Sequence, residues 1–302
     1  MPRKINQYMH KACVAVSNPS LVGQRVGYNF RRSCADLLAV RGYYTYRYKI
    51  IFLAGMALGG STWMKNLLSK IPGYYSISTP MPEDVRYRQN ICDSAFKYVP
   101  TYGYTLFKTH LNPSKVNIEC LNRNGVEKIL VTYRDLRDVI ISRYHRLMAV
   151  PKKKGAFDYI DYRELPKEQA LDHSLELVAE FYVPWINGWL QKVRDEPDRF
   201  MAVTFEELKA DTEATYRKVL DFYQITLPLD LIKQNIENSK GKGDLQKNMS
   251  DAEVLPFGLS SNFRSGRVGQ WREELSQLQI ERCKELMGAI LIELGYEDSL
   301  KW

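Results

Sequence analysis

The sequence has little cysteine and no motif built from it. Five cysteines occur in 302 residues, none of them in a CxxC pair, and their odd number does not suit a disulfide framework. We therefore expect reduced thiols, as in a cytoplasmic protein. The cysteines are Cys13, Cys34, Cys92, Cys120 and Cys283.

Long apolar runs are also absent. The longest, such as residues 50–60, fall well short of the about 20 residues that a membrane-spanning helix needs. The N-terminus begins Met-Pro-Arg-Lys and has no apolar stretch typical of a signal peptide. These absences argue against a membrane-anchored, lumenal enzyme, and we expect a cytoplasmic protein that does not bind membranes.

Low-complexity tracts and short repeats are missing too. With 45% hydrophobic and 26% charged residues, the composition is that of an ordinary globular protein. The length suits one large α/β domain or two small ones. We expect a basic and aromatic arm at residues 1–46, packed on a domain at residues 47–302, in a monomer or a homodimer.

Basic residues exceed acidic ones, and the net charge is +8. Such an excess favours anionic partners: a nucleotide, a nucleic acid or a membrane surface. The basic residues are spread along the chain without a repeated pattern of interleaved aromatic residues. We therefore favour a compact polyanionic ligand over a nucleic-acid surface.

Strands and helices are predicted to alternate. Short apolar runs predict buried strands at residues 50–54, 104–107, 128–133 and 200–204. Helices are predicted at residues 63–71, from an N-cap at Asp135 to about residue 148, at about 210–224 and at 272–294. This alternation predicts an α/β fold with a central parallel sheet flanked by helices on both faces. Residues 241–269 lack regular pattern, and we interpret them as a lid over a bound ligand.

A glycine-rich loop joins the first predicted strand to its helix. Residues 55–62 nearly fit the pattern GxxxxGK[ST], through Gly55, Gly60 and Thr62, and predict a single P-loop-type domain. Ser61 stands where that pattern has lysine, so a P-loop kinase would lose its central cation and is a weak candidate. An ordinary glycine turn is the other alternative. Free N–H groups at the helix start favour a phosphate site instead.

From this loop on, the sequence resembles the cytosolic-type sulfotransferases, over about residues 48–275. Their loop reads approximately Pro-Lys-Ser-Gly-Thr-Thr-Trp where this chain has residues 57–63. The resemblance implies that the donor is 3′-phosphoadenosine 5′-phosphosulfate (PAPS), that the product is 3′-phosphoadenosine 5′-phosphate (PAP), and that no metal is needed. It implies that Trp63 lies near the adenine. The residues it implies for the 5′-phosphosulfate end are Gly59, Gly60, Ser61 and Thr62.

Two further stretches carry the resemblance. Arg134 and Ser142 keep the spacing of eight that the family has between an arginine and a serine, which implies that they bind the 3′-phosphate. Taken alone, Arg134 could instead pair with Asp135 or Asp138, and Ser142 could bond its own helix backbone. Near the C-terminus, residues 263–271 resemble the family stretch Arg-Lys-Gly-x-x-Gly-Asp-Trp. The residues that this stretch implies for a second clasp on the 3′-phosphate are Arg264, Ser265 and Gly266.

The catalytic residues follow the second predicted strand. Residues 108–111, Lys-Thr-His-Leu, match the family stretch that supplies the catalytic base, which implies that His110 takes the proton from an acceptor hydroxyl. Lys108, two residues earlier in an extended strand, would offset negative charge on the sulfuryl group and the leaving phosphate. The alternative is that His110 merely closes a strand end.

The sequence also departs from the family. Leu58 replaces the loop lysine, and Phe205 replaces a tyrosine whose hydroxyl contacts the donor. Another cation (Lys108, Lys65 or Arg267) could cover the charge, the enzyme could be slow, or the protein could bind the nucleotide without turnover. We favour the first. An adenine-stacking phenylalanine is not evident near residue 240, where Asn238 and Ser239 stand.

The acceptor is expected to be a small molecule with a hydroxyl or amine group. Candidate pocket segments are residues 1–46, 75–104 and 150–171. Tyrosines that could line it are Tyr74, Tyr75, Tyr87, Tyr98, Tyr102, Tyr104, Tyr159 and Tyr162. Most tyrosines in a globular chain pack in the interior instead.

Overall fold

A computed structural model describes residues 30, 33–34, 36–77, 89–100, 102–149, 160–239 and 266–302, except the side chains of Lys97 and Tyr98. Its strands are β1 (Ile50–Gly55), β2 (Tyr74–Ile77), β3 (Tyr104–Thr109), β4 (Ile129–Tyr133) and β5 (Phe200–Thr204). Its helices are α3 (Ser61–Leu68), η2 (Asp93–Tyr98), α4 (Lys115–Arg123), α5 (Leu136–Ala149), η3 (Tyr162–Glu164), α6 (Lys167–Asp195), α7 (Phe205–Ala210), α8 (Thr212–Phe222), α9 (Leu229–Glu237), α11 (Trp271–Glu274) and α12 (Gln277–Glu293).

The strands form one parallel sheet in the order β2-β3-β1-β4-β5. In the ladder, Ala54 of β1 pairs with Thr109 of β3, and Gly55 pairs with Thr132 of β4. The three strands therefore end side by side at one edge of the sheet. In parallel α/β sheets, ligands bind beyond this carboxyl edge. The predicted parallel α/β fold is confirmed.

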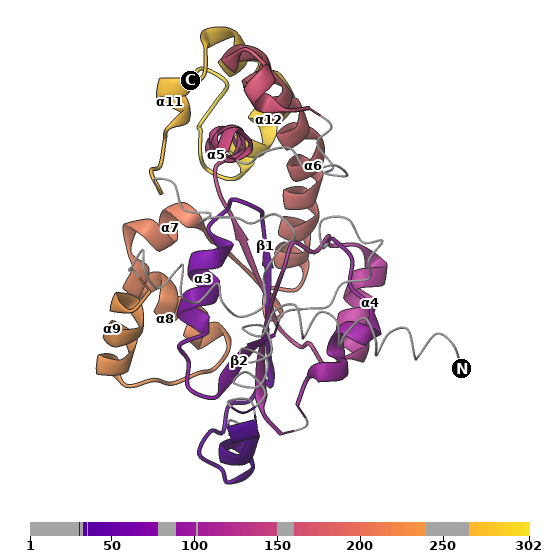
Figure 1. Ribbon diagram of the computed structural model, residues 1–302, viewed down its shortest axis with the longest axis vertical. Coiled ribbons are helices and arrows are strands. Elements are labelled where there is room, and N and C mark those ends of the chain that lie inside the picture. The colour runs from indigo at the N-terminus through magenta and orange to yellow at the C-terminus, as the bar shows by residue number, and fades with distance from the viewer. Residues whose placement is uncertain are drawn as a thin grey trace, which may run out of the picture.

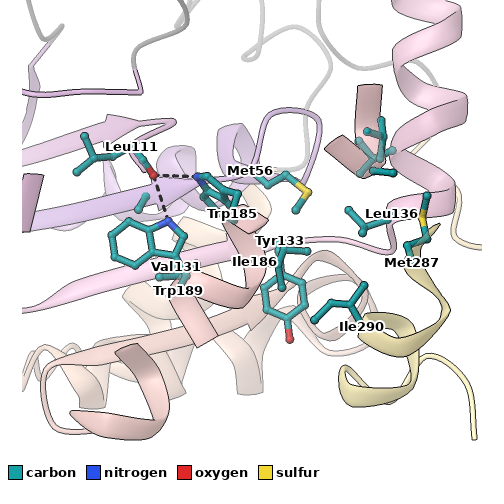
Figure 2. Close-up of a cluster of buried hydrophobic side chains, with 14 of the residues drawn as sticks. Met56, Leu111, Val131, Tyr133, Leu136, Trp185, Ile186, Trp189, Met287 and Ile290 are labelled. Atoms are coloured by element: carbon teal, nitrogen blue, oxygen red, sulfur yellow. Dashed lines mark hydrogen bonds between the residues drawn. The ribbon is translucent and has the colours of Figure 1, made fainter. Parts of the chain in front are cut away.

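Alternate residues of β1 face two separate cores. Ile50, Phe52 and Ala54 belong to a cluster with side chains of α4, α5, α6 and α12, part of which Figure 2 shows. Ile51 and Leu53 point the other way, into a cluster with α3, α8 and α9. Figure 1 shows α3, α8 and α9 on one side of the sheet and α4 and α6 on the other. Because the central strand is buried on both faces, it is continuously apolar and not alternating.

One predicted helix is split in two, and another is preceded by a short helix that the sequence did not predict. Asp211 caps α8 by accepting the N–H of Ala214 at 2.9 Å, so the helix predicted at about 210–224 is α8, preceded by the separate α7. Ser276 caps α12 with a capping box, so the helix predicted at 272–294 is the short α11 followed by α12. In both places a polar side chain accepts a hydrogen bond from the first N–H groups of a helix. This favours the start of a new helix at that residue over continuation of the preceding helix.

The longest described helix, α6, has 29 residues and contains Pro184. The sequence did not predict it, and the candidate pocket segment at residues 150–171 includes η3 and the start of α6. Tyr162 of η3 is 1% exposed and packs in the first core, so this tyrosine does not line an acceptor site. Among the residues that the structure describes, no helix is long and apolar enough to span a bilayer.

Tyrosines gather at the amino end of the sheet, opposite to His110. Tyr74 and Tyr104 begin β2 and β3, and their ring centroids lie 5.2 Å apart. The Tyr104 hydroxyl donates to the backbone carbonyls of Tyr44 and Tyr46, at 3.1 and 3.3 Å. Tyr74 and Tyr104 are therefore core residues, and the interpretation that they line an acceptor site was wrong. Tyr87 and Tyr159, most of residues 1–46 and most of the predicted lid lie outside the described residues.

Candidate functional site

The loop between β1 and α3 has the geometry of an anion site. Gly60, the N-cap of α3, has φ 77°, in the left-handed region that favours glycine. Glycine has no side chain to cap the helix, so the first N–H groups of α3, at Ser61 and Thr62, receive no capping side chain from it. Such groups attract phosphate oxygens through hydrogen bonds and the helix dipole. The structure thus brings the predicted Gly59, Gly60, Ser61 and Thr62 into one turn.

Glycines allow the backbone to pack closely here. A Cβ added to Gly55 would lie 2.2 Å from Ser61 Cβ, and one added to Gly60 would lie 2.6 Å from Phe205 Cδ2. Helix α3 therefore begins directly above the end of β1, and α7 packs against the loop. Larger side chains would force these elements apart.

Leu58 also has a positive φ, of 66°. A leucine in this region costs roughly 1–2 kcal/mol, because its Cβ crowds the following carbonyl. Its side chain is partly buried and packs against the first core. Leu58 is thus a packing residue at the position where the family has lysine.

Arg134 lies at the carboxyl end of β4 and is 4% exposed. Its Nη1 donates to Ser142 Oγ at 3.2 Å, so the two residues predicted to share the 3′-phosphate are in contact. Its Nη2 donates to Asp138 Oδ2 at 3.0 Å and to the carbonyl of Arg267. Its buried Nε has no hydrogen-bond partner among the described residues, and the carboxylate of Glu206 lies 3.9 Å from it. A buried guanidinium with an unused donor fits an anionic ligand.

Asp138 connects Arg134 with the C-terminal stretch, residues 263–271, that is predicted to contact the 3′-phosphate. Its fully buried carboxylate accepts the backbone N–H of Gly269 at 2.8 Å and that of Trp271 at 3.2 Å. The carbonyl of Gly266 accepts a hydrogen bond from Lys209 Nζ. The structure therefore brings the chain at Gly266 next to the predicted 3′-phosphate residues. The other two predicted clasp residues, Arg264 and Ser265, lie outside the described residues.

Phe205 connects the glycine loop with Arg134. Its ring lies 6.1 Å from the Trp63 indole in an edge-on arrangement, and the Arg134 guanidinium lies 4.6 Å from its centroid. The Trp63 indole N–H donates to Ser239 Oγ at 3.3 Å. The Trp63 and Phe205 rings thus lie together beside the loop, where the resemblance implies the adenine, and Ser239 holds the indole.

His110 follows β3 and contacts the end of β1. Its Nδ1 lies 2.5 Å from the carbonyl oxygen of Gly55. A carbonyl can only accept, so Nδ1 carries the proton and, in the neutral ring, the basic lone pair is on Nε2. Lys108 alternates with Phe107 along β3 and so lies on the sheet face that α3 covers. Both predicted catalytic residues are therefore at the same sheet edge as the loop and Arg134.

Two partners of this site were not found from the sequence. Glu206 accepts the N–H of Asp135 at 3.3 Å and the Tyr296 hydroxyl at 2.9 Å, and its burial raises the pKa of its carboxyl. Arg137, 1% exposed, pairs with Asp135 and Glu297. Its guanidinium lies over the rings of both Trp271 and Trp302, at 3.9 and 4.4 Å from their centroids. The only sequence signal was an unusual density of charge in residues 134–138.

A cavity of about 600 Å³ lies beside Arg134, between the ends of β4 and β5. It is lined by residues flanking Arg134, by Glu206 and Glu207, and by residues 268–269 and 294–296. Arg134, Ser142 and His110 do not line it. The cavity is therefore formed by chain neighbours of Arg134, and neither Arg134 and Ser142, predicted to bind the 3′-phosphate, nor the predicted base faces it.

Comparisons with known proteins match most of the chain. A family model described as the sulfotransferase domain matches residues 49–295. Flavonol 3-sulfotransferase of Flaveria bidentis is 25% identical over 260 residues, which cover 78% of this chain and 80% of that protein. Sulfotransferase 6B1 of Gorilla gorilla gorilla is 23% identical over 293 residues, covering 93% and 91%.

Solved structures share the fold. The mouse sulfotransferase SULT7A1 complexed with PAP superposes with a TM-score of 0.61 at 18% identity, covering 82% of this chain and 86% of that one. Retinol dehydratase in complex with androsterone and inactive cofactor PAP gives a TM-score of 0.52 at 17% identity, covering 80% of each chain. At these identities the likeness shows the common α/β architecture.

Proposed function

Because the chain belongs to the family of proteins with a sulfotransferase domain and is a PAPS-dependent sulfotransferase, we propose that it sulfates a hydroxyl or amine group of a small molecule, with His110 as the base. The observation that carries the proposal is the contact between His110 Nδ1 and the Gly55 carbonyl. It leaves Nε2 as the basic nitrogen, at the sheet edge where the phosphate-type loop begins. We further propose a cytoplasmic location.

The chain's residues fit the donor in two places. The uncapped start of α3 suits the 5′-phosphosulfate end. Arg134, with its contact to Ser142 and its unused Nε donor, suits the 3′-phosphate, and the clasp at Gly266 lies beside it. Leu58 and Phe205 remove two contacts that the family resemblance implies. We propose that Lys108 supplies the positive charge that Leu58 does not.

The roles of the residues follow from this placement. The donor supplies a sulfuryl group and departs as PAP. His110 Nε2 accepts the proton of the attacking hydroxyl, and the Gly55 carbonyl stabilises the resulting imidazolium through the N–H at Nδ1. Lys108 and the start of α3 oppose the negative charge of the leaving phosphate. The proton then passes from His110 to solvent.

The acceptor class rests on relatives. The relatives include a flavonol sulfotransferase, and the superposed retinol dehydratase was solved with androsterone. These are small apolar molecules with hydroxyl groups, and we propose an acceptor of that kind for this chain.

His110→Ala tests the proposal. We expect sulfuryl transfer from radiolabelled PAPS to a panel of phenols, alcohols and amines to be lost, while calorimetry gives a PAP affinity within about twofold of the wild type. His173→Ala, a histidine on α6 whose Nδ1 contacts the Tyr162 hydroxyl at 2.8 Å, is the matched control and should stay active. Full activity of His110→Ala would remove the base from the mechanism.

A second candidate function is a PAP-binding protein without turnover. Leu58, a packing residue where the family has lysine, is the observation that favours it. PAP binding together with no transfer to any acceptor in the panel would select this candidate. Magnesium-dependent ATP binding would select a P-loop kinase, and we expect none.

A further inference from the structure

Two tryptophans of α6 donate to one backbone carbonyl next to His110. The indole N–H of Trp185 lies 2.8 Å from the oxygen of Leu111, and that of Trp189 lies 3.1 Å from the same oxygen. Figure 2 shows both bonds converging on it. Trp185 is 5% exposed, Trp189 is 1% exposed, and Leu111 is fully buried. Both lone pairs of this carbonyl are therefore satisfied by side chains, away from water.

Helix α6 packs closely against residues 111–113, and its sequence allows this. Trp185 and Trp189 are four residues apart and so lie on the same face of the helix, with their rings edge to face at 6.2 Å. Gly188 lies between them, and a Cβ there would be 2.5 Å from Pro113 Cγ. The glycine lets the helix backbone come close enough for both indoles to reach Leu111.

The other side of His110 is fixed as well. The Leu111 N–H donates to Thr109 Oγ1 at 3.3 Å, and Thr109 pairs with Ala54 in the β ladder. His110 thus stands between a residue held by the sheet and a carbonyl held by two indoles. Its ring in turn contacts the end of β1 through Nδ1. The orientation of the His110 ring therefore depends on the backbone conformation of Thr109 and Leu111.

We propose that Trp185 and Trp189 are positioning residues that hold His110 with Nδ1 on the Gly55 carbonyl and Nε2 as the base. This inference rests on the proposed function of His110. Loss of one indole N–H leaves the Leu111 carbonyl with one partner. Loss of both leaves a buried acceptor without any, and the chain after β3 would rotate to satisfy it.

The test uses Trp185→Phe, Trp189→Phe and the double variant, because phenylalanine keeps an aromatic ring and removes the donor. We expect each single variant to lower kcat by less than about threefold and the double variant to lower it about ten- to a hundredfold, as small misplacements of a reacting group do. The KM for PAPS and the Kd for PAP should stay within about twofold. The matched control is Tyr223→Phe, which removes a buried hydroxyl that donates to the Phe52 carbonyl at 3.2 Å on the other sheet face. It should leave kcat unchanged.

A second measurement does not need turnover. In protein labelled with ¹⁵N-histidine, the His110 signal, assigned with His110→Ala, should show the Nδ1-protonated tautomer in the wild type and a mixture of tautomers in the double variant. If the wild type transfers no sulfuryl group, the proposed function fails while this spectrum still decides the positioning.

The proposal is overturned if the double variant keeps kcat within twofold, or if its His110 spectrum matches that of the wild type. It is also overturned if kcat of the double variant falls by the same factor as its affinity for PAP. Should the double variant not fold, Gly188→Ala replaces it, since a Cβ there pushes α6 from Pro113 and lengthens both bonds. Gly188→Ala should then reproduce the tautomer mixture, and an unchanged spectrum would contradict the inference.

Discussion

Replacing Asp138 with asparagine should weaken both the fold and the donor site. The wild-type carboxylate is fully buried and accepts from Arg134, from the N–H of Gly269 and from the N–H of Trp271. An asparagine side chain offers one oxygen and one NH₂ group at the same place. In either orientation the NH₂ group faces at least one donor, and Arg134 loses its closest counter-ion.

The size of the effect follows from the burial of the pair. Arg134 and Asp138 have side chains 5% and 0% exposed, so solvent does not screen their interaction. Removing one partner of such a pair typically costs about 3–5 kcal/mol, because the other charge stays buried and unpaired. We expect Asp138→Asn to lower the free energy of unfolding by an amount in this range. PAP affinity should fall as well, because the backbone from Gly269 to Trp271 is no longer held beside Arg134.

Urea unfolding followed by tryptophan fluorescence measures the first effect, and calorimetry with PAP measures the second. Asp298→Asn, which changes an exposed aspartate, is the control and should alter neither. If Asp138→Asn unfolds within about 1 kcal/mol of the wild type and binds PAP within twofold, the carboxylate does not organise the clasp and the reasoning is wrong.

Three further predictions concern the loop, the thiols and a buried acid. Leu58→Lys should change kcat by less than about threefold if Lys108 already supplies the charge; a gain of about a hundredfold would show that the charge was missing. Burial raises the pKa of Cys120 to about 11 and that of Cys283 to about 12, so neither thiol should react with Ellman's reagent at pH 8 before urea is added. Rapid reaction of either thiol in the native protein would contradict this. Burial also raises the pKa of Glu206, so its contribution to wild-type stability is greatest below the ordinary carboxyl pKa and falls as pH rises through the raised value. Raising the pH from about 4.5 to about 7.5 should therefore lower the unfolding free energy of the wild type relative to that of Glu206→Gln. A difference between the two proteins that does not change with pH would refute the assignment.

The buried strands could be predicted from the sequence. Strand β5 spans Phe200–Thr204 as predicted, and β1, β3 and β4 differ from the predicted runs by one or two residues at an end. These strands are apolar because helices cover both faces of the sheet, and such runs are visible without any tertiary information. Strand β2 was missed. It is a four-residue edge strand, Tyr-Tyr-Ser-Ile, directly after a Pro-Gly turn, and its strand character comes from pairing with β3.

The motifs predicted side chains that the structure brings together at one edge of the sheet, but they did not give the contacts among them. The glycine loop, Arg134 and His110 follow β1, β4 and β3, so their convergence follows from parallel topology. The contacts from Asp138 to Gly269 and Trp271 join residues more than 130 positions apart. Sequence spacing carries no information on such pairs. The predicted alternative of a salt bridge from Arg134 to Asp138 is present as well, in addition to the contact with Ser142.

The contacts of Arg137 with Trp271 and Trp302 connect the predicted 3′-phosphate residues with residue 302. Arg137 also pairs with Asp135, the neighbour of Arg134, so a displacement of the Trp302 ring would reach, through one guanidinium, the backbone beside the arginine predicted to bind phosphate. A tag or fusion partner joined directly after residue 302 would press on this cluster of rings. Trp302 should therefore be treated as an internal residue in engineered versions, with any such attachment placed behind a long flexible spacer.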